Sequence, residues 1–467
     1  MYGAITSRDE RFDGVFYTAV RTTGVYCKPS CPARKPHRNN VTFYPFAAAA
    51  QSAGYRACRR CVPEALPGSP LWNVRGSVAG RALELIERGV LDDEGVSGLA
   101  RRLGYSTRSV TRTVVQETGA TPIAHARARR ARVAKELLGA SDQPISDIAF
   151  AAGFSSIRQF NATMSAIYGR SPSQLRRTSA ARASGVVRAT LAYRAPFDFG
   201  ALLDWYTTRA LPGVEEARDG TYQVALAMPF GTAILTLRDD PERSQILADL
   251  DLADLRDYGA TCAAARRLLD LDADPVGIDA HLTSSSALGD VASKHPGMRL
   301  PGTPTPTEAL LRALTGQQVS VASGLAQMQR MVDAAGDGSQ DDTDLVPFPS
   351  VSAIAAAGLA WFRGPDARRR TIGDLLDLAV REQLDSADDP AQVAELLRTV
   401  KGVGPWTVAY TLLRGFGSPD VDLSGDRAIV NAVAALGNGN RGDAAKVLAS
   451  ASPWRSYAAM HLWRSGT

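Results

Sequence analysis

The chain has 467 residues, of which 45% are hydrophobic and 22% are charged, a balance that is typical of folded globular domains. This length predicts roughly three or four domains. The sequence contains no uninterrupted apolar stretch of about 18 residues and begins with a polar segment, so we expect no membrane span, no export and a cytoplasmic location.

The charge is distributed unevenly along the chain. Residues 1–178 carry 26 Lys and Arg against 13 Asp and Glu, whereas the remaining 289 residues carry 27 against 35. A basic front half predicts that this part of the protein binds a polyanion such as DNA.

Residues 1–70 are rich in cysteine and contain two close pairs, Cys27/Cys31 and Cys58/Cys61. Two such pairs can supply four thiolates to one tetrahedral Zn²⁺, and a module this small needs a metal or a similar constraint to fold. Chance clustering and two disulfides are the alternatives. We expect one Zn²⁺ bound by all four cysteines.

The segments around these cysteines, 19–34 and 54–61, resemble the N-terminal zinc domain of the Ada adaptive-response regulators. In that family, the first zinc cysteine also accepts a methyl group from a DNA methylphosphotriester. The resemblance implies a small α/β module in which Cys27 is the methyl acceptor. The alternative is that Cys27 is only a metal ligand.

Residues 76–178 have a helical pattern with an internal repeat about 50 residues long. The segment 100–106 matches 149–155, and 119–122 matches 169–172. In each copy, a short helix, a turn containing glycine and a second helix predict a helix-turn-helix unit. The pair resembles the all-α DNA-binding domain of the AraC family, which implies promoter DNA and RNA polymerase as partners.

The polar side chains of the second helix in each unit are the candidates for DNA contacts, because Arg, Gln and Asn read base edges and phosphates. For each one, a solvent-exposed helix face without a ligand is the alternative. The candidates are Arg108, Arg112, Ser156, Arg158, Gln159 and Asn161.

Residues 186–300 predict a mixed α+β domain. Alternating apolar residues indicate strands over 187–193, 224–228 and 233–237, and a helix is expected over 200–209. Residues 244–300 look mostly helical. Residues 301–467 predict an all-α domain, so the whole chain is expected to be multidomain and mainly helical.

A glycine hairpin, Lys401–Thr407, lies between predicted helices at 390–400 and 405–416, and Asp426 follows it at the start of an apolar helix over 428–436. A hairpin of this kind lets backbone amides hold a phosphate. The arrangement resembles the helix-hairpin-helix DNA glycosylases. The best match is the bacterial 3-methyladenine DNA glycosylase II (AlkA) group, and the resemblance covers residues 186–467.

This resemblance implies that Asp426 is the catalytic carboxylate, which stabilises the oxocarbenium charge that forms when an alkylated purine leaves. The alternative is a helix N-cap, a task that Ser424 could also perform. The resemblance also implies that Trp406, Tyr410 and Trp463 line the base pocket, whereas Trp454 is expected to pack in the core.

The hairpin glycines Gly402 and Gly404 are expected to contact DNA, as is Gln318. Gln318 stands where well-known family members have a leucine that fills the gap left by the flipped base. Trp406 replaces the lysine of lyase-active relatives, which implies a monofunctional hydrolase without a Schiff base. With Cys262 as the only cysteine after residue 61, no iron–sulfur cluster is expected.

These observations predict a fusion in which a methylphosphotriester sensor and transcription activator precede a glycosylase that excises alkylated purines. Two alternatives remain: a regulator whose rear half is a non-catalytic DNA clamp, and a glycosylase whose zinc module only anchors it to DNA. We expect a monomer with domains at 1–70, 76–178, 186–300 and 301–467.

Overall fold

The fold was analysed in a computed structural model. It describes residues 1–9, 12–61, 63, 78–176, 186–317, 319–336, 345–387, 389–438 and 441–466. Gln318 and the expected domain ends at residues 70 and 178 lie outside these residues. None of the helices described is both long and apolar enough to cross a lipid bilayer.

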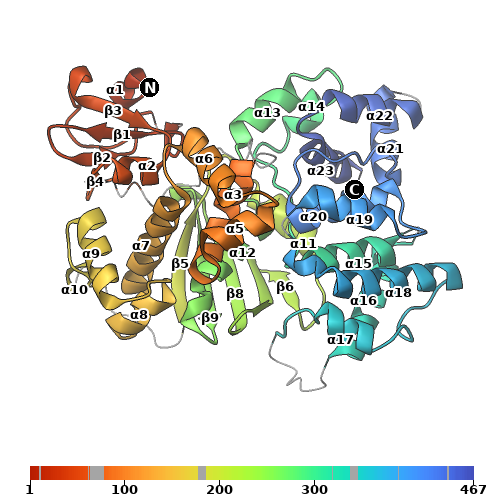
Figure 1. The fold of residues 1–467 in the computed structure, drawn as a ribbon. Coiled ribbons are helices and arrows are strands. Elements are labelled where there is room, and N and C mark those ends of the chain that lie inside the picture. The colour runs from red at the N-terminus through yellow and green to blue at the C-terminus, as the bar shows by residue number, and fades with distance from the viewer. Residues whose placement is uncertain are drawn as a thin grey trace. The chain divides into compact units, whose positions relative to one another are not determined.

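The chain divides into two compact units (Figure 1). The first unit consists of Met1–Tyr193, Met228–Ala233 and Gln245–Ala263. The second unit consists of Arg194–Ala227, Ile234–Ser244 and Ala264–Thr467. The predicted fold class, multidomain and mainly helical, is confirmed.

The cysteine-rich module at the start of the first unit is built on a sheet of four short strands in the order β3-β1-β2-β4. Strand β1 pairs antiparallel with β2 and β3, and β2 pairs parallel with β4. The elements of this module are α1 (Tyr2–Ser7), β1 (Tyr17–Val20), β2 (Val25–Cys27), β3 (Val41–Tyr44), α2 (Ala47–Ser52) and β4 (Arg56–Ala57).

The helices described between residues 78 and 176 contain both predicted helix-turn-helix units, α5 with α6 and α8 with α9. They are α3 (Val78–Glu87), α4 (Val90–Asp93), α5 (Gly95–Leu103), α6 (Thr107–Thr118), α7 (Pro122–Ala140), α8 (Ile145–Ala151), α9 (Ile157–Tyr168) and α10 (Pro172–Arg176).

The sequence repeat corresponds to a repeat of helix boundaries. Ser106 and Ser156 begin α6 and α9, and each hydroxyl accepts a hydrogen bond at 3.2 Å from a backbone N–H of the first turn. Gly119 and Gly169 end the same helices with left-handed φ angles of 75° and 62°. These capping residues explain why α6 and α9 begin and end at equivalent positions of the sequence repeat.

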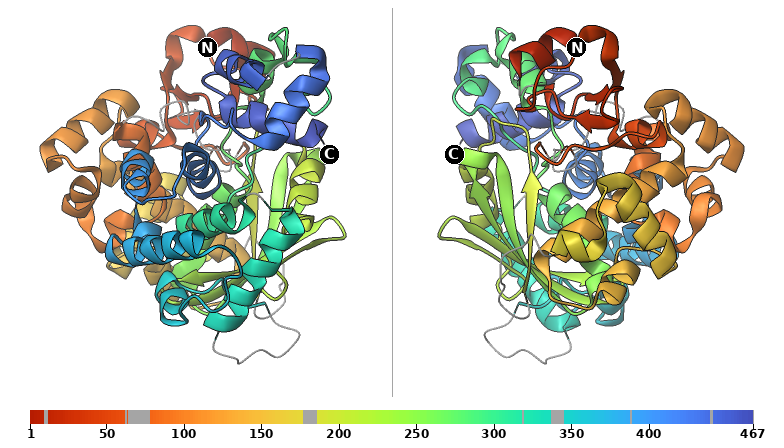
Figure 2. Two further views of the ribbon diagram at one scale, coloured as in Figure 1. Left: turned by 90° about the vertical axis from the view of Figure 1, so that its right-hand side faces the viewer. Right: turned by 90° about the vertical axis from the view of Figure 1, so that its left-hand side faces the viewer.

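The mixed domain contains a five-stranded sheet in the order β5-β9-β8-β7-β6, which can be followed in Figure 2. Its elements are β5 (Val186–Ala192), α11 (Phe199–Thr207), β6 (Glu215–Arg218), β7 (Thr221–Met228), β8 (Gly231–Asp240), β9 (Gln245–Leu252) and α12 (Tyr258–Leu268). The expectation that residues 244–300 are mostly helical is wrong for β9. Its alternating residues Ile246, Ala248 and Leu250 are fully buried, and the strand pairs with β5.

The second unit is completed by helices, and those between residues 306 and 416 contribute to one large apolar core. They are α13 (Pro275–Thr283), α14 (Gly289–Ala292), α15 (Pro306–Gly316), α16 (Val321–Ala335), α17 (Val351–Ala356), α18 (Asp366–Arg381), α19 (Pro390–Arg398), α20 (Pro405–Phe416), α21 (Arg427–Val433), α22 (Arg441–Ser450) and α23 (Arg455–Ser465). The predicted helix over 428–436 ends earlier, because a π-helical turn (Ala434–Asn438) follows α21.

The turn glycines of the two helix-turn-helix units are not equivalent in their surroundings. Gly104 and Gly153 both have positive φ angles, 74° and 90°. A Cβ atom at Gly104 would meet nothing within 4 Å, whereas a Cβ atom at Gly153 would lie 2.5 Å from a carboxylate oxygen of Asp92. That carboxylate holds Arg129 and Arg130 of α7, each at 2.6 Å.

We therefore predict that Gly153→Ala destabilises the chain more than Gly104→Ala. Both substitutions carry the cost of a left-handed alanine, about 1 kcal/mol. Gly153→Ala also disturbs a partly buried ion pair, and the total loss is expected to be about 3 kcal/mol. Thermal unfolding of the two variants measures the difference, and equal losses would show that the Asp92 contact contributes nothing.

Candidate functional site

The four clustered cysteines converge at one end of the first sheet. Cys27 ends β2, Cys31 follows it in a loop, and Cys58 and Cys61 follow β4. Their four sulfur atoms lie within 4.8 Å of one another. The parallel pairing of β2 with β4 brings the two sequence-distant pairs together, so the arrangement matches a single tetrahedral ion rather than two separate sites.

The loop between Cys27 and Cys31 is fixed by the carboxylate of Asp13. Its oxygens accept hydrogen bonds from the Ser30 backbone N–H at 3.0 Å and the Ser30 hydroxyl at 2.6 Å, and one also pairs with the Lys28 ammonium at 2.8 Å. These contacts hold the two cysteines at the separation that a common ion requires.

The chemistry of the donor set fits Zn²⁺. Hydrogen bonds with Cys31 and Cys61, together with burial, raise the pKa of the Cys27 thiol. The hydrogen bond with Cys27 lowers the pKa of Cys31. A soft dication bound among the four sulfurs would let all of them act as thiolates. The predicted zinc site is confirmed as a cluster of four cysteines.

In the second unit, the carboxylate of Asp426 is held by four N–H donors. The indole nitrogens of Trp406 and Trp463 donate to Oδ2 at 2.7 Å and to Oδ1 at 3.1 Å. The backbone N–H groups of Ala428 and Ile429 donate to Oδ1 at 2.9 and 3.1 Å. Asp426 is therefore the N-cap of α21, and the two indoles add a second set of donors that a cap alone does not need.

Three predicted aromatic residues lie around this carboxylate. The rings of Trp406 and Tyr410 stack with centroids 5.2 Å apart, and Trp463 meets Tyr410 edge-on at 6.4 Å. All three line the same cavity as Asp426, which has a volume of about 1450 Å³. Trp454 does not line it and instead contacts Tyr457 edge-on at 6.2 Å.

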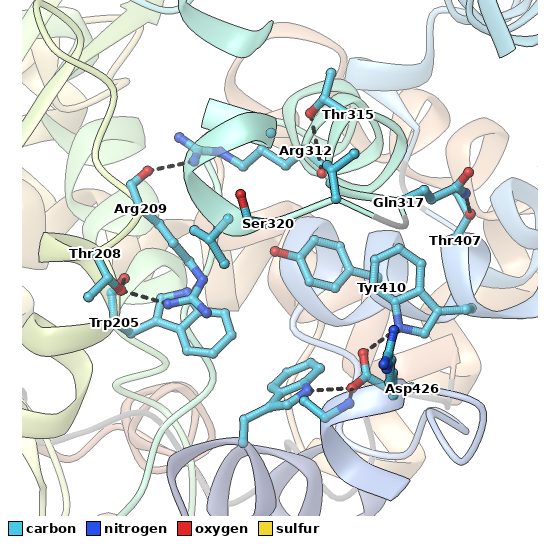
Figure 3. Close-up of a pocket in the computed structure, with 18 of the residues that line it drawn as sticks. Trp205, Thr208, Arg209, Arg312, Thr315, Gln317, Ser320, Thr407, Tyr410 and Asp426 are labelled. Atoms are coloured by element: carbon cyan, nitrogen blue, oxygen red, sulfur yellow. Dashed lines mark hydrogen bonds between the residues drawn. The ribbon is translucent and has the colours of Figure 1, made fainter. Parts of the chain in front are cut away.

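Figure 3 shows two further residues of the cavity, Trp205 and Arg209, which the sequence analysis missed. The Trp205 ring lies 5.3 Å from that of Trp463, and the Arg209 guanidinium lies 3.6 Å above Trp205. Burial lowers the pKa of Arg209 to about 10. The only sequence signal was their spacing of four residues at the end of a predicted helix, and nothing in it linked that helix to Asp426.

The buried guanidinium of Arg414 fixes the side chain of Tyr410, which forms part of the cavity wall. Arg414 is 2% exposed and donates from Nη1 to the Tyr410 hydroxyl at 2.9 Å and from Nε to the Pro301 carbonyl at 2.6 Å. Tyr410 and Arg414 are one turn apart on α20, so the helix places the tyrosine ring and the guanidinium that binds its hydroxyl side by side.

The glycine hairpin lies at the edge of this cavity, and its two glycines differ. Gly402 has a φ angle of 96°, and a Cβ atom there would collide with the Thr371 hydroxyl, which donates to the Lys401 carbonyl at 2.9 Å. Gly404 is the N-cap of α20, has no side-chain cap and has open space where a Cβ would be. The amides at the start of α20 are thus free of a capping side chain.

The candidate DNA-contacting residues of the helix-turn-helix units lie on α6 and α9. The side chains of Arg108, Arg112, Arg158 and Gln159 are exposed, and the Gln159 amide oxygen accepts from Ser155 at 3.1 Å. Ser156 is used as the N-cap of α9, and Asn161 is exposed. Gln318, the expected wedge, lies outside the described residues.

Comparison with known protein families finds three matches along the chain. Residues 1–64 match the metal binding domain of Ada, residues 99–178 match a helix-turn-helix domain, and residues 188–304 match the AlkA N-terminal domain.

Two curated relatives and one solved structure extend these matches. The chain is 43% identical to the "probable bifunctional transcriptional activator/DNA repair enzyme AlkA" of Mycobacterium tuberculosis, over 99% of this chain and 95% of that protein. It is 30% identical to the DNA-3-methyladenine glycosylase 2 of Escherichia coli, over 59% of this chain and 96% of the relative. The fold resembles that of a 3-methyladenine DNA glycosylase from Archaeoglobus fulgidus, with a TM-score of 0.53 at 17% identity, covering 60% of this chain and 98% of the other.

We predict that the purified chain carries about one Zn²⁺, and that Cys31→Ala abolishes this binding because the site loses one of its four ligands. Metal analysis by mass spectrometry gives the stoichiometry. Cys262→Ala is the matched control, since this buried cysteine is not part of the cluster. Full zinc content in Cys31→Ala, or its loss in Cys262→Ala, would contradict the assignment.

Proposed function

We infer, because the chain belongs to the family of bifunctional transcriptional activator/DNA repair enzymes named AlkA, that it both senses alkylated DNA and removes alkylated bases from it. The observation that carries the repair half is the Asp426 carboxylate, held by two indole N–H groups inside an aromatic cavity. The four-cysteine cluster carries the sensing half.

In the proposed repair reaction, Asp426 acts on the sugar of a flipped nucleotide. An alkylated purine is cationic and leaves readily, so the barrier lies in the positive charge that builds on the sugar as the N-glycosidic bond breaks. A fixed carboxylate stabilises that charge without having to reorganise. The electron pair of the broken bond leaves with the base, a water molecule forms the new C–O bond to the sugar, and the proton of that water passes to solvent.

The aromatic walls select the substrate. The faces of Trp406 and Tyr410 carry negative quadrupole charge, which favours a planar cationic base such as that of a 3-methyladenine nucleotide. Trp406 also stands where a lysine would form a Schiff base, so the proposed reaction is hydrolysis without strand cleavage.

The hairpin is proposed to hold the DNA backbone at the cavity. The uncapped amides at the start of α20 and the open space at Gly404 suit a phosphate group, and Gly402 permits the turn that precedes them. We propose that Gln318 supports the orphaned partner of the flipped base.

In the proposed sensing reaction, Cys27 attacks the methyl group of a DNA methylphosphotriester. The S–CH₃ bond forms as the methyl C–O bond breaks, and the phosphodiester anion leaves with the electron pair. A bound Zn²⁺ keeps the Cys27 sulfur as a thiolate, the nucleophilic form. Transfer is irreversible and leaves Cys27 as a neutral thioether, which removes a negative charge that repels DNA.

The helix-turn-helix helices are proposed to read the promoter. Arg108 and Arg112 of α6 and Arg158 and Gln159 of α9 are exposed side chains of the types that contact phosphates and base edges. We propose that the chain binds double-stranded promoter DNA as a monomer and recruits RNA polymerase.

We predict that Asp426→Asn lowers release of alkylated bases from methylated duplex DNA by about a hundredfold or more, because the neutral amide cannot stabilise the sugar cation. Asparagine is also a good N-cap, so the fold should be retained. Base release is measured by chromatography under single-turnover conditions, with binding to the same duplex measured in parallel.

Asp422→Asn is the matched control, since Asp422 is an aspartate of the same loop. It should release base at the wild-type rate. Unchanged release by Asp426→Asn would remove Asp426 from the mechanism. A wild-type chain that binds the duplex but releases no base would favour the non-catalytic clamp.

A further inference from the structure

A threonine lies directly across the sheet from the proposed methyl acceptor. Thr18 of β1 is the register partner of Cys27 at the end of β2. Residues opposite one another in an antiparallel pair project from the same face of the sheet, with Cβ atoms about 5 Å apart. Thr18 also faces Phe43 of β3, so its side chain lies between Cys27 and an aromatic ring.

The Thr18 hydroxyl is buried and lacks a hydrogen-bond partner. The residue is 3% exposed, and within the described parts of the chain no donor or acceptor pairs with its Oγ1 atom. Its neighbours on this face, Phe16 and Phe43, belong to an apolar cluster and offer no acceptor. A buried hydroxyl normally has a partner, so this one needs an explanation.

The strand register pairs Thr18 with Cys27, and in this structure the hydroxyl makes no hydrogen bond to the Cys27 sulfur. With the two Cβ atoms about 5 Å apart, rotation of the side chains brings the hydroxyl and the sulfur within hydrogen-bond distance. As a thiolate, the sulfur accepts hydrogen bonds strongly, whereas a thioether is a weak acceptor. A hydroxyl donor next to a metal-bound thiolate stabilises the negative charge on sulfur and lowers its nucleophilicity. The same bond weakens once the sulfur carries a methyl group.

We propose that Thr18 is a positioning residue for Cys27, whose hydroxyl donates to the thiolate in the metal-loaded site and thereby restrains its reaction with methyl donors. This inference rests on the proposed methyl transfer at Cys27. It assigns Thr18 the task of stabilising Cys27 as a ligand and slowing its methylation, and it leaves the choice of nucleophile unchanged.

The test compares Thr18→Val and Thr18→Ser in the full-length, zinc-loaded chain. Valine keeps the shape and removes the hydroxyl, whereas serine keeps the hydroxyl. Methyl iodide is the methyl donor: the S–CH₃ bond forms as the C–I bond breaks and iodide leaves. Mass spectrometry of the digested protein measures the rate of methylation at Cys27.

Thr18→Val should be methylated about fivefold faster than wild type, the factor expected from one hydrogen bond of ordinary strength. It should also release zinc to a chelator faster, and after Co²⁺ substitution its sulfur-to-metal absorption band should shift, because the donor to sulfur is lost. Thr18→Ser should restore all three properties toward wild type.

Thr42→Val is the matched control, because Thr42 pairs with Ala19 on the opposite face of the same sheet. It should behave as wild type. Should Thr18→Val not retain zinc, Thr18→Ala and Thr18→Ser make the same comparison of variants without and with the hydroxyl.

Equal methylation rates and equal absorption bands in the variants with and without the hydroxyl would overturn the role of Thr18. Failure of the wild-type chain to be methylated at Cys27, with methylation at other cysteines instead, would refute the proposed methyl acceptor. The two failures are therefore distinguishable in one experiment.

Discussion

The repair half of the protein depends on one carboxylate being shared by three segments of the chain. Asp426 caps α21, receives the indole N–H of Trp406 from α20 and receives that of Trp463 from α23. A carboxylate with four donors cannot rotate away from the cavity, so its negative charge is fixed in place before substrate arrives. The same bonds set the planes of both indoles, and Tyr410 and Trp205 then pack against those rings.

In the sensing half, sulfur atoms from distant segments of the chain meet at one point, as the donors to the Asp426 carboxylate do in the repair half. The short strands β2 and β4 bring Cys27 and Cys58 from distant parts of the sequence to one point. Four thiolates repel one another unless a cation binds them, so folding of this module and the thiolate form of its cysteines are linked through the metal. In both halves, the group that is proposed to carry the chemistry also stabilises the local fold.

Much of this organisation was predictable from sequence because it depends on local rules. The caps Ser106 and Ser156 and the turn glycines Gly104 and Gly153 carry the helix-turn-helix repeat, and cysteine spacing carries the metal site. Strand β9 was missed because Ala248 and Leu250 are good helix formers, and only pairing with β5 decides their state. Packing between distant segments likewise brings Trp205 and Arg209 to the cavity. It also gives the cap residue Asp426 its two indole donors. No local sequence pattern encodes these contacts.

Asp426 is proposed to stabilise a cation that forms on the sugar. The most direct measurement compares the affinity of the protein for duplex DNA that carries a cationic pyrrolidine in place of one sugar with its affinity for a duplex that carries the neutral tetrahydrofuran analogue. We expect the wild-type chain to bind the cationic duplex much more tightly, and Asp426→Asn to lose this preference while still binding the neutral duplex. An undiminished preference in Asp426→Asn would contradict this role of Asp426.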